Sequence, residues 1–276
     1  PFMAAVAAHR GRLPFVLTPH FHGNGHSPFR RLLHVPYRLL GCWLVRRSSR
    51  VIAVSAAEAH LLRQHFGSDP RITVIPNGVD VEELAGQDAK RCRAGSRLLL
   101  AGGRLEAYKQ TQRIVEALAL LPDSFRLEIL GDGPERTRLQ ELTQRSAVQE
   151  RVRFLGRISR QELTRRYCSS DLFVSMSLHE AFGLAVLEGA VAGCHVIASD
   201  IPAHREVAGI VGVDRVTLVG PHSSPADLAR ACVEAPARTG LPPTGWGAIP
   251  TWSRMVEGAI SCYSLALAPA GDPSRR

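Results

Sequence analysis

The chain alternates short apolar runs with segments of helical pattern, and this alternation constrains its fold more than any other feature. The run RVIAVS leads into SAAEAHLLRQHFG, where Ser55 and Glu58 have the spacing of a capping box and Gly67 ends the segment. The same order recurs with RLLLAGG, FRLEILGDG, VRFLGRIS, DLFVSMS and HVIAS. Strands that alternate with helices predict a parallel sheet covered on both faces, which is an α/β fold.

The alternation forms two series separated by a polar stretch, residues 81–95, which we expect to be a linker. Two such series predict two doubly wound domains. The first domain is expected at residues 1–82 and the second at residues 94–250. A last segment with helical periodicity, residues 251–268, predicts a closing helix that packs back on the first domain. The first series has three strands where a full doubly wound unit has about six. We therefore expect the chain to be a fragment that lacks the start of its first domain.

The 276 residues contain 34 Lys and Arg against 25 Asp and Glu, a formal net charge of +9. Such a charge favours anionic partners, although a solvated Arg-rich surface is an equal alternative. The basic run at residues 30–50 fits either a helix at an anionic membrane or an amphipathic helix packed on the sheet. No apolar run has the length of a membrane span, and the six cysteines form no CxxC pair. These features predict a reduced cytoplasmic protein, with contact at the inner face of the membrane left open.

Glycines and cations follow several of the predicted strands. Gly103, Arg104 and Lys109 come after RLLLA, while GDG follows LEIL and GRI follows RFL. Ligands bind beyond the carboxyl ends of the strands in an open parallel sheet. Glycines allow close backbone approach and helix amides attract anions, so this edge suits a diphosphate. Any one of these stretches could be a plain turn, but several at one edge predict a site.

Two carboxylates, Glu180 and Glu188, interrupt a segment that otherwise has the composition of a protein core. A helix over about residues 182–193 would separate them by roughly 12 Å, the scale of a sugar diphosphate joined to a ribose. A carboxylate can accept hydrogen bonds from two hydroxyls, so each acid could hold one polyol end. The amides of Gly183 and Leu184 would lie between them. The alternative is a capping Glu180 and a Glu188 that faces solvent.

The segment EAFGLAVLE resembles the Glu-x7-Glu motif of family-4-type retaining glycosyltransferases with the GT-B fold. AGGRLEAYK is similar to a Gly-Arg-Leu…Lys segment of that family, LGDGPE to its Gly-Asp-Gly-Pro turn, FLGRIS to its base-proximal loop and VIPNGVD to its interdomain crossover. The resemblance covers roughly residues 14–208. It implies two Rossmann-like domains that face each other across a cleft, the first of them incomplete here.

The resemblance also implies a reaction: metal-independent transfer of a sugar, with retention, from a nucleotide-diphosphate sugar to an acceptor sugar, lipid or small molecule. No cofactor is expected. The implied catalytic residues are His20, Arg104, Lys109 and Glu180. The implied donor-binding residues are Gly103, Arg104, Lys109, Arg157, Ile158, Phe182, Gly183, Leu184 and Glu188. Arg104 and Lys109 would neutralise the diphosphate. Glu188 would hold the ribose and Glu180 would face the transferred sugar, while Arg157 and Ile158 would lie beside the base.

Three histidines, His20, His22 and His26, follow the strand FVLT of the first domain. Zinc is the weaker interpretation, because no Cys or carboxylate lies close by and the spacing fits no strong zinc signature. We therefore predict no metal site. The resemblance makes His20 the active-site histidine, with His22 as the alternative.

Two other functional classes compete with a transferase. A non-catalytic nucleotide- or nucleic-acid-binding α/β protein would account for the charge, but a nucleic-acid groove gains nothing from two acids at the ligand face. The aromatic content of 6% is also low for base stacking, so nucleic acid is not an expected partner. A GT-B phosphorylase would need a lysine motif for a pyridoxal cofactor, which is absent from the sequence. Gln110 departs from the family, in which a glycine is common after the lysine. The sequence leaves the donor base, the sugar, the acceptor and the linkage open.

Overall fold

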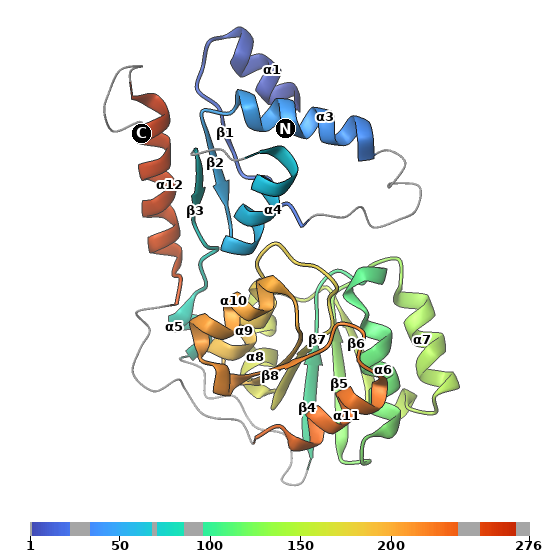
Figure 1. Ribbon diagram of the computed structural model, residues 1–276. Coiled ribbons are helices and arrows are strands. Elements are labelled where there is room, and N and C mark those ends of the chain that lie inside the picture. The colour runs from blue at the N-terminus through green and yellow to red at the C-terminus, as the bar shows by residue number, and fades with distance from the viewer. Residues whose placement is uncertain (1, 23–33, 68–70, 86–95, 237–248, 269–276) are drawn as a thin grey trace. The chain divides into compact units, whose positions relative to one another are not determined.

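The structure is a computed structural model that describes residues 2–22, 34–67, 71–85, 96–236 and 249–268. The chain divides into two compact units (Figure 1). Unit 1 comprises residues 1–78 together with 250–276, and unit 2 comprises residues 79–249. Because the carboxyl-terminal segment belongs to unit 1, the chain leaves this unit once and returns to it.

Unit 1 contains a parallel sheet of three strands in the order β1-β2-β3. One face of β2 packs through Val51 and Ala53 against α3 and α4, and the other face packs through Ile52 against Met255 and Cys262 of α12. The closing helix therefore lies on the unit 1 sheet. The elements are α1 (Phe2–Arg10), β1 (Val16–Leu17), α3 (His34–Arg47), β2 (Arg50–Ala53), α4 (Ala56–Phe66), β3 (Ile72–Val74) and α12 (Trp252–Leu267).

A buried carboxylate connects β1 to α4 in unit 1. The Ser55 hydroxyl caps α4 by accepting from the amide of Glu58 at 2.8 Å. The Glu58 side chain in turn accepts from the amide of Val54 at 2.6 Å and from the amide of Phe21. Glu58 is 1% exposed, and this burial raises its pKa despite the two backbone hydrogen bonds. The loop that follows β1 is thereby held to the start of α4.

Unit 2 has six parallel strands in the order β6-β5-β4-β7-β8-β9. Numbered from the first strand of this unit, the order is 3-2-1-4-5-6, the order of a dinucleotide-binding fold. The strands are β4 (Arg97–Ala101), β5 (Phe125–Leu130), β6 (Val152–Gly156), β7 (Leu172–Ser175), β8 (His195–Ser199) and β9 (Val216–Val219). The helices are α5 (Val81–Ala85), α6 (Thr111–Leu120), α7 (Arg136–Arg145), α8 (Arg160–Ser169), α9 (Leu184–Val191), α10 (Pro202–Val211) and α11 (Pro225–Glu234), with 3₁₀ turns η1 (Ala107–Lys109), η2 (Gln149–Arg151) and η3 (Val213–Arg215).

Helices cover both faces of the unit 2 sheet (Figure 1). Leu99 and Ala101 of β4 pack in one apolar cluster with α6, α7 and α11. Phe173 of β7 packs on the opposite face, where its ring lies 5.5 Å from that of Tyr167 in α8 and beside Gly189 of α9. Since both faces are buried, the strands are mainly apolar; in β4, RLLLA, the four residues after the arginine are all buried.

The α/β fold with two parallel sheets is confirmed, and two local expectations need correction. The stretch after Val81 was expected to be a linker, but it begins with the short helix α5. β9 was not expected; it carries only four residues, VTLV, and three of them are half-buried at the edge of the sheet. Within the described ranges, no helix combines the length and hydropathy that crossing a membrane requires.

Candidate active site

The strand order of unit 2 reverses between β4 and β7, and most of the predicted site residues follow these two strands. β4 and β7 are adjacent and parallel, with Leu99 paired to Leu172. Gly103, Arg104 and Lys109 lie in the segment between β4 and α6, and residues 177–183 lie in the loop after β7. The crevice at such a reversal is where ligands bind in doubly wound sheets.

Glycines allow the loops after β4 and β5 to pack directly on each other. Gly131 has a φ of 90°, and a Cβ atom added there would lie 2.0 Å from the carbonyl oxygen of Gly103. Gly103 itself has a φ of 124°, and its position for a Cβ atom is 3.7 Å from the Nζ of Lys109. The ammonium of Lys109 therefore lies close to the exposed backbone of Gly103, an arrangement suited to an anionic ligand.

Lys109 and Glu180 join the β4 loop to the β7 loop. The Nζ of Lys109 is 2.5 Å from the Oε1 of Glu180, and the two side chains are 18% and 19% exposed. Next to this pair, the rings of Tyr108 and His179 stack at 4.8 Å with an interplanar angle of 13°. The amide of Leu178 donates to the carbonyl of Tyr108 at 2.9 Å. The sequence had predicted both charges but not their direct pairing.

Glu180 remains ionised although it is largely buried. Burial alone would raise its pKa, but the charge of Lys109 and hydrogen bonds from Lys109 and Ser177 outweigh this and lower it. A second buried group stands behind the same loop: the Nδ1 of His204 is 2.9 Å from the carbonyl oxygen of Ser199. Burial lowers the pKa of His204, which favours the neutral imidazole.

The helix that carries Glu188 begins at Leu184, two residues later than expected. Gly183 has a φ of 94°, so it cannot continue a right-handed helix and instead ends the loop. Gly183 supplies no capping side chain to the first amides of α9. A Cβ atom added there would lie 3.1 Å from the Cδ2 of His204. The backbone of Gly183 and Leu184 thus forms the amino end of α9, while Phe182 is buried at 2% exposure.

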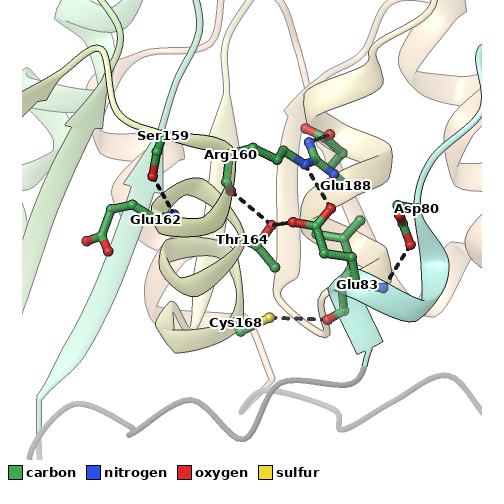
Figure 2. A network of polar contacts seen from close by, with 9 residues as sticks. Asp80, Glu83, Ser159, Arg160, Glu162, Thr164, Cys168 and Glu188 are labelled. Atoms are coloured by element: carbon green, nitrogen blue, oxygen red, sulfur yellow. Dashed lines mark hydrogen bonds and ion pairs between the residues drawn. The ribbon is translucent and has the colours of Figure 1, made fainter.

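Glu188 is the fifth residue of α9, and it pairs with Arg160 of α8 rather than facing solvent (Figure 2). The Nη1 of Arg160 is 2.6 Å from the Oε1 of Glu188, whose side chain is 10% exposed. The Nε of Arg160 is 3.0 Å from Glu83 of α5. The buried Tyr167 hydroxyl lies near Glu188, and burial together with this carboxylate raises the pKa of Tyr167 well above its usual range.

The remaining predicted residues of unit 2 are more exposed. The Nε of Arg104 lies 3.1 Å from Glu106, and its side chain is 76% exposed. Arg157 is exposed and Ile158 is half-buried; both follow β6, whose last residue, Gly156, accepts from the amide of Gly131 at 2.7 Å. These residues lie at the carboxyl edge of the sheet, but only Lys109 and Glu180 of the predicted set contact each other through a salt bridge.

The predicted histidine lies in the other unit. His20 is exposed and has a φ of 49°, in the left-handed region, and it directly precedes Phe21, whose amide donates to Glu58. His22 is half-buried, and His26 lies outside the described residues. Among the residues that the structure describes, no group of three or more His, Cys, Asp or Glu side chains has an arrangement that could hold a metal ion.

Sequence reasoning missed three side chains that shape the site: Tyr108, Arg160 and His204. Tyr108 had a usable signal, because it directly precedes the predicted Lys109. Arg160 is 28 residues from Glu188 and His204 is 21 residues from Gly183, so their roles depend on how α8 and α10 pack beside α9.

Gln110 stands where the family commonly has glycine, and its backbone conformation is unfavourable for a residue with a side chain. It has a φ of 52°, in the left-handed region, and it is the first residue before α6. A residue with a side chain pays about 1–2 kcal/mol in this conformation. Its side chain offsets part of this by donating to the carbonyl of Ala107 at 2.8 Å and accepting from Arg113 at 3.1 Å.

Comparisons with known proteins match the sequence of this chain to two family models. Residues 87–234 match the family Glycosyl transferases group 1, and residues 1–83 match Glycosyltransferase Family 4. The D-inositol 3-phosphate glycosyltransferase of Geodermatophilus obscurus is 31% identical in an alignment of 256 residues that covers 84% of this chain and 56% of that protein. The GDP-mannose:cellobiosyl-diphosphopolyprenol alpha-mannosyltransferase of Xanthomonas campestris is 36% identical over 162 residues, 56% of this chain and 41% of that protein. The chain thus spans about half the length of the curated relatives it matches.

Solved structures share the fold. HepE of Anabaena, crystallised with UDP and glucose, superimposes with a TM-score of 0.77 at 22% identity, covering 95% of this chain and 74% of that one. This likeness shows that the two Rossmann-like units follow the GT-B arrangement of strands and helices that the sequence predicted. The match of the group 1 family, residues 87–234, begins after α5 and extends to the end of α11, and so includes every predicted site residue of unit 2. The chain therefore belongs to the Glycosyl transferases group 1 family.

Proposed function

We propose that the chain serves a glycosyltransferase that moves a sugar from a nucleotide-diphosphate sugar to an acceptor, with retention of the anomeric configuration and without a metal ion. The observation that carries the proposal is the Lys109–Glu180 pair at the strand reversal, beside the amino end of α9. A fixed cation, helix amides and glycine backbone at one edge form a site for a departing diphosphate.

The donor would lie along the carboxyl edge of unit 2. Lys109 and the amides of Gly183 and Leu184 would meet the diphosphate, and the exposed Arg104 would exchange its partner Glu106 for a phosphate oxygen. Glu188 would accept from the ribose hydroxyls. Arg157 and Ile158 would lie beside the base, because they follow β6, at the far side of β5 from Lys109. Glu180 would face the transferred sugar, and His20 remains the proposed catalytic histidine.

Protein groups would take the place of a metal ion in this reaction. Negative charge grows on the diphosphate as the sugar departs, and Lys109, Arg104 and the α9 amides stabilise it most in the transition state. The pairing with Glu180 fits this role, because the Oε1 of Glu180, 2.5 Å from the Nζ of Lys109, holds the ammonium in place. Retention is the outcome that the family resemblance implies for such a site.

The donor is tested by calorimetry of the full chain with UDP, GDP and ADP, followed by transfer assays with the matching sugar nucleotides. UDP and GDP come first, because HepE was solved with UDP and the Xanthomonas relative is named for GDP-mannose. We expect one diphosphate to bind, and Glu188→Ala to weaken it by about 1–3 kcal/mol, the value of hydrogen bonds to a charged group. Failure of all three to bind would refute the proposal.

The transfer itself is tested by product analysis with EDTA present. Nuclear magnetic resonance of the product should show the donor's anomeric configuration, and EDTA should leave the rate unchanged. Binding of a nucleotide with no transfer to any acceptor offered would favour the non-catalytic alternative. Loss of activity in EDTA that Mn²⁺ restores would contradict metal independence.

The charge distribution supports a phosphate-bearing partner on the acceptor side. Unit 1 contains 13 of the 34 Lys and Arg residues and four of the 25 Asp and Glu residues, whereas unit 2 contains 21 of each kind. The net charge of +9 therefore belongs to unit 1 alone. Two relatives are named for phosphorylated acceptors, D-inositol 3-phosphate and a diphosphopolyprenol. We propose that unit 1 draws in an acceptor that carries phosphate, either in solution or at an anionic membrane.

A further inference from the structure

Arg160 joins two carboxylates that come from distant parts of the unit 2 sequence (Figure 2). It is the first residue of α8, and its Nη1 lies 2.6 Å from the Oε1 of Glu188 in α9. Its Nε lies 3.0 Å from the Oε2 of Glu83 in α5. A guanidinium presents its donors in a rigid plane, so two simultaneous pairings fix both its position and its orientation.

The second carboxylate is itself held in place. The hydroxyl of Thr164, one turn along α8, donates to the Oε1 of Glu83 at 2.6 Å. This hydrogen bond, followed by the contact with Arg160, lowers the pKa of Glu83. The Sγ of Cys168, one turn further, contacts the carbonyl of Leu84 at 3.1 Å. Three successive turns of α8 therefore bind α5, and Glu83 is a fixed support for Arg160.

The hydrogen bonds of Glu188 leave room for a ligand. A carboxylate can accept about four hydrogen bonds in all. Arg160 uses one acceptor site, and the nearby Tyr167 hydroxyl can use another. About two sites remain, as many as the 2′ and 3′ hydroxyls of a ribose require. Arg160 can thus stay in place while a nucleotide binds, holding the carboxylate at the angle that the ribose needs.

We infer that Arg160 is a positioning residue for ribose recognition: supported by Glu83, it holds Glu188 in the orientation that accepts the two ribose hydroxyls. This inference rests on the proposed donor site, and it adds a prediction about which nucleotides the loss of Arg160 affects. Loss of Arg160 should weaken only those nucleotides that carry ribose hydroxyls. A general loss of positive charge near the phosphates would weaken every nucleotide equally.

The test compares a nucleoside diphosphate with its 2′,3′-dideoxy form in calorimetry of the full chain, using whichever of UDP, GDP and ADP binds best. Arg160→Met should weaken the ribose form about tenfold, the effect of losing one hydrogen bond to a charged group, and leave the affinity for the dideoxy form unchanged. Arg160→Lys keeps the charge but not the planar fork, and should fall between the two. Glu83→Gln should reproduce a smaller, several-fold loss with the same dependence on the hydroxyls.

Arg165→Met is the matched control. Arg165 lies on the same helix, is 57% exposed on its side chain and pairs at 3.7 Å with Glu162. The Arg165→Met variant should bind the ribose form and the dideoxy form with the same affinities as the unchanged chain. Equal losses for both forms in Arg160→Met, unchanged binding, or tighter binding because Arg160 competes with the ribose would each overturn the inference. If Arg160→Met does not fold, Glu83→Gln decides by the same comparison. Failure of the unchanged chain to bind any of the three diphosphates would instead refute the proposed function, and the inference with it.

Discussion

At the scale of single residues, the Lys109–Glu180 pair sets the character of the site. Each side chain has lost about four-fifths of its exposure, so each would be costly to leave charged alone. Burial works to raise the pKa of Glu180, and the neighbouring ammonium more than reverses it. The pair therefore keeps a carboxylate ionised at the place where the transferred sugar is proposed to lie.

Lys109→Met should lower the free energy of unfolding by about 1–3 kcal/mol at pH 7, between the values for exposed and buried pairs, because it leaves Glu180 unpaired. The folded-state pKa of Glu180 is lower than its usual value, so the pair stabilises the fold above about pH 4.3 and this gain is lost as the pH falls through the lowered pKa. Urea denaturation at pH 7 and near pH 3 measures both effects. The difference between the two proteins should shrink at the lower pH.

The double variant Lys109→Met, Glu180→Gln is the control for this prediction. It removes the charge that the single variant leaves unpaired, so it should be more stable than Lys109→Met alone. A single variant that is as stable as the unchanged chain at pH 7 would show that solvent screens the pair.

Single residues also show where sequence reasoning stops. Glycines and charges next to a predicted strand end, such as Gly103 and Lys109, could be predicted because chain neighbours and strand ends locate them. Arg160 could not, because its partner Glu83 is 77 residues earlier in the sequence. That pairing depends on the packing of α5 against α8, and α5 itself was expected to be part of a linker.

At the scale of elements, the fold was largely predictable because buried parallel strands are short, apolar and bounded by glycine or capping residues. All five strands expected in unit 2 are present. The boundary of α9 was not predictable from periodicity, since only the left-handed φ of Gly183 ends the preceding loop. β9 was not predicted, because an edge strand of four residues has too short a sequence pattern to distinguish it from a loop.

Two glycines inside neighbouring helices should respond in opposite ways to replacement by alanine. A Cβ atom at Gly189 of α9 would lie 2.8 Å from the Cβ of Phe173 in β7, whereas one at Gly209 of α10 would have no neighbour within 4 Å. Gly189→Ala should therefore cost about 1–3 kcal/mol through overpacking. Gly209→Ala should add about 0.5–1 kcal/mol, because alanine loses less backbone entropy in a helix.

Thermal and urea denaturation of the two variants measure this contrast, and each variant is the control for the other. The structure requires opposite signs. A loss of stability in both would mean that α10 has a close neighbour beside Gly209, and a gain in both would mean that α9 does not pack tightly on β7.

At the scale of the whole molecule, charge and ligand chemistry are divided between the units. Unit 2 is neutral in formal charge, and its cations are balanced locally by acids, as in the pairings of Arg166 with Glu128 and Glu162. Unit 1 instead contains 13 Lys and Arg residues against four Asp and Glu residues. His9, Arg10, Arg12 and Arg47 line a cavity of 680 Å³, and Arg47, Arg50 and Arg71 line a second one of 300 Å³; no Asp or Glu is among the described residues that line either cavity.

The cations of unit 1 should therefore bind phosphate groups in a salt-dependent way. Vesicles with a third of anionic phospholipid should bind the full chain at 50 mM salt and release it at 500 mM, since each basic residue near such a surface contributes about 1 kcal/mol and salt screens it. Vesicles of phosphatidylcholine alone are the control.

Two triple variants that each lose three charges locate the phosphate-binding surface. Replacing Arg10, Arg12 and Arg47 of unit 1 by Gln should abolish binding to the anionic vesicles. Replacing the exposed residues Arg138, Arg145 and Arg153 of unit 2 by Gln should preserve it. A soluble inositol phosphate separates the two sources of phosphate: if it binds unit 1 and the vesicles do not, the acceptor side serves a soluble phosphorylated molecule. Equal losses in the two triple variants would mean that net charge alone matters, and the assignment of the phosphate-bearing partner to unit 1 would then be wrong.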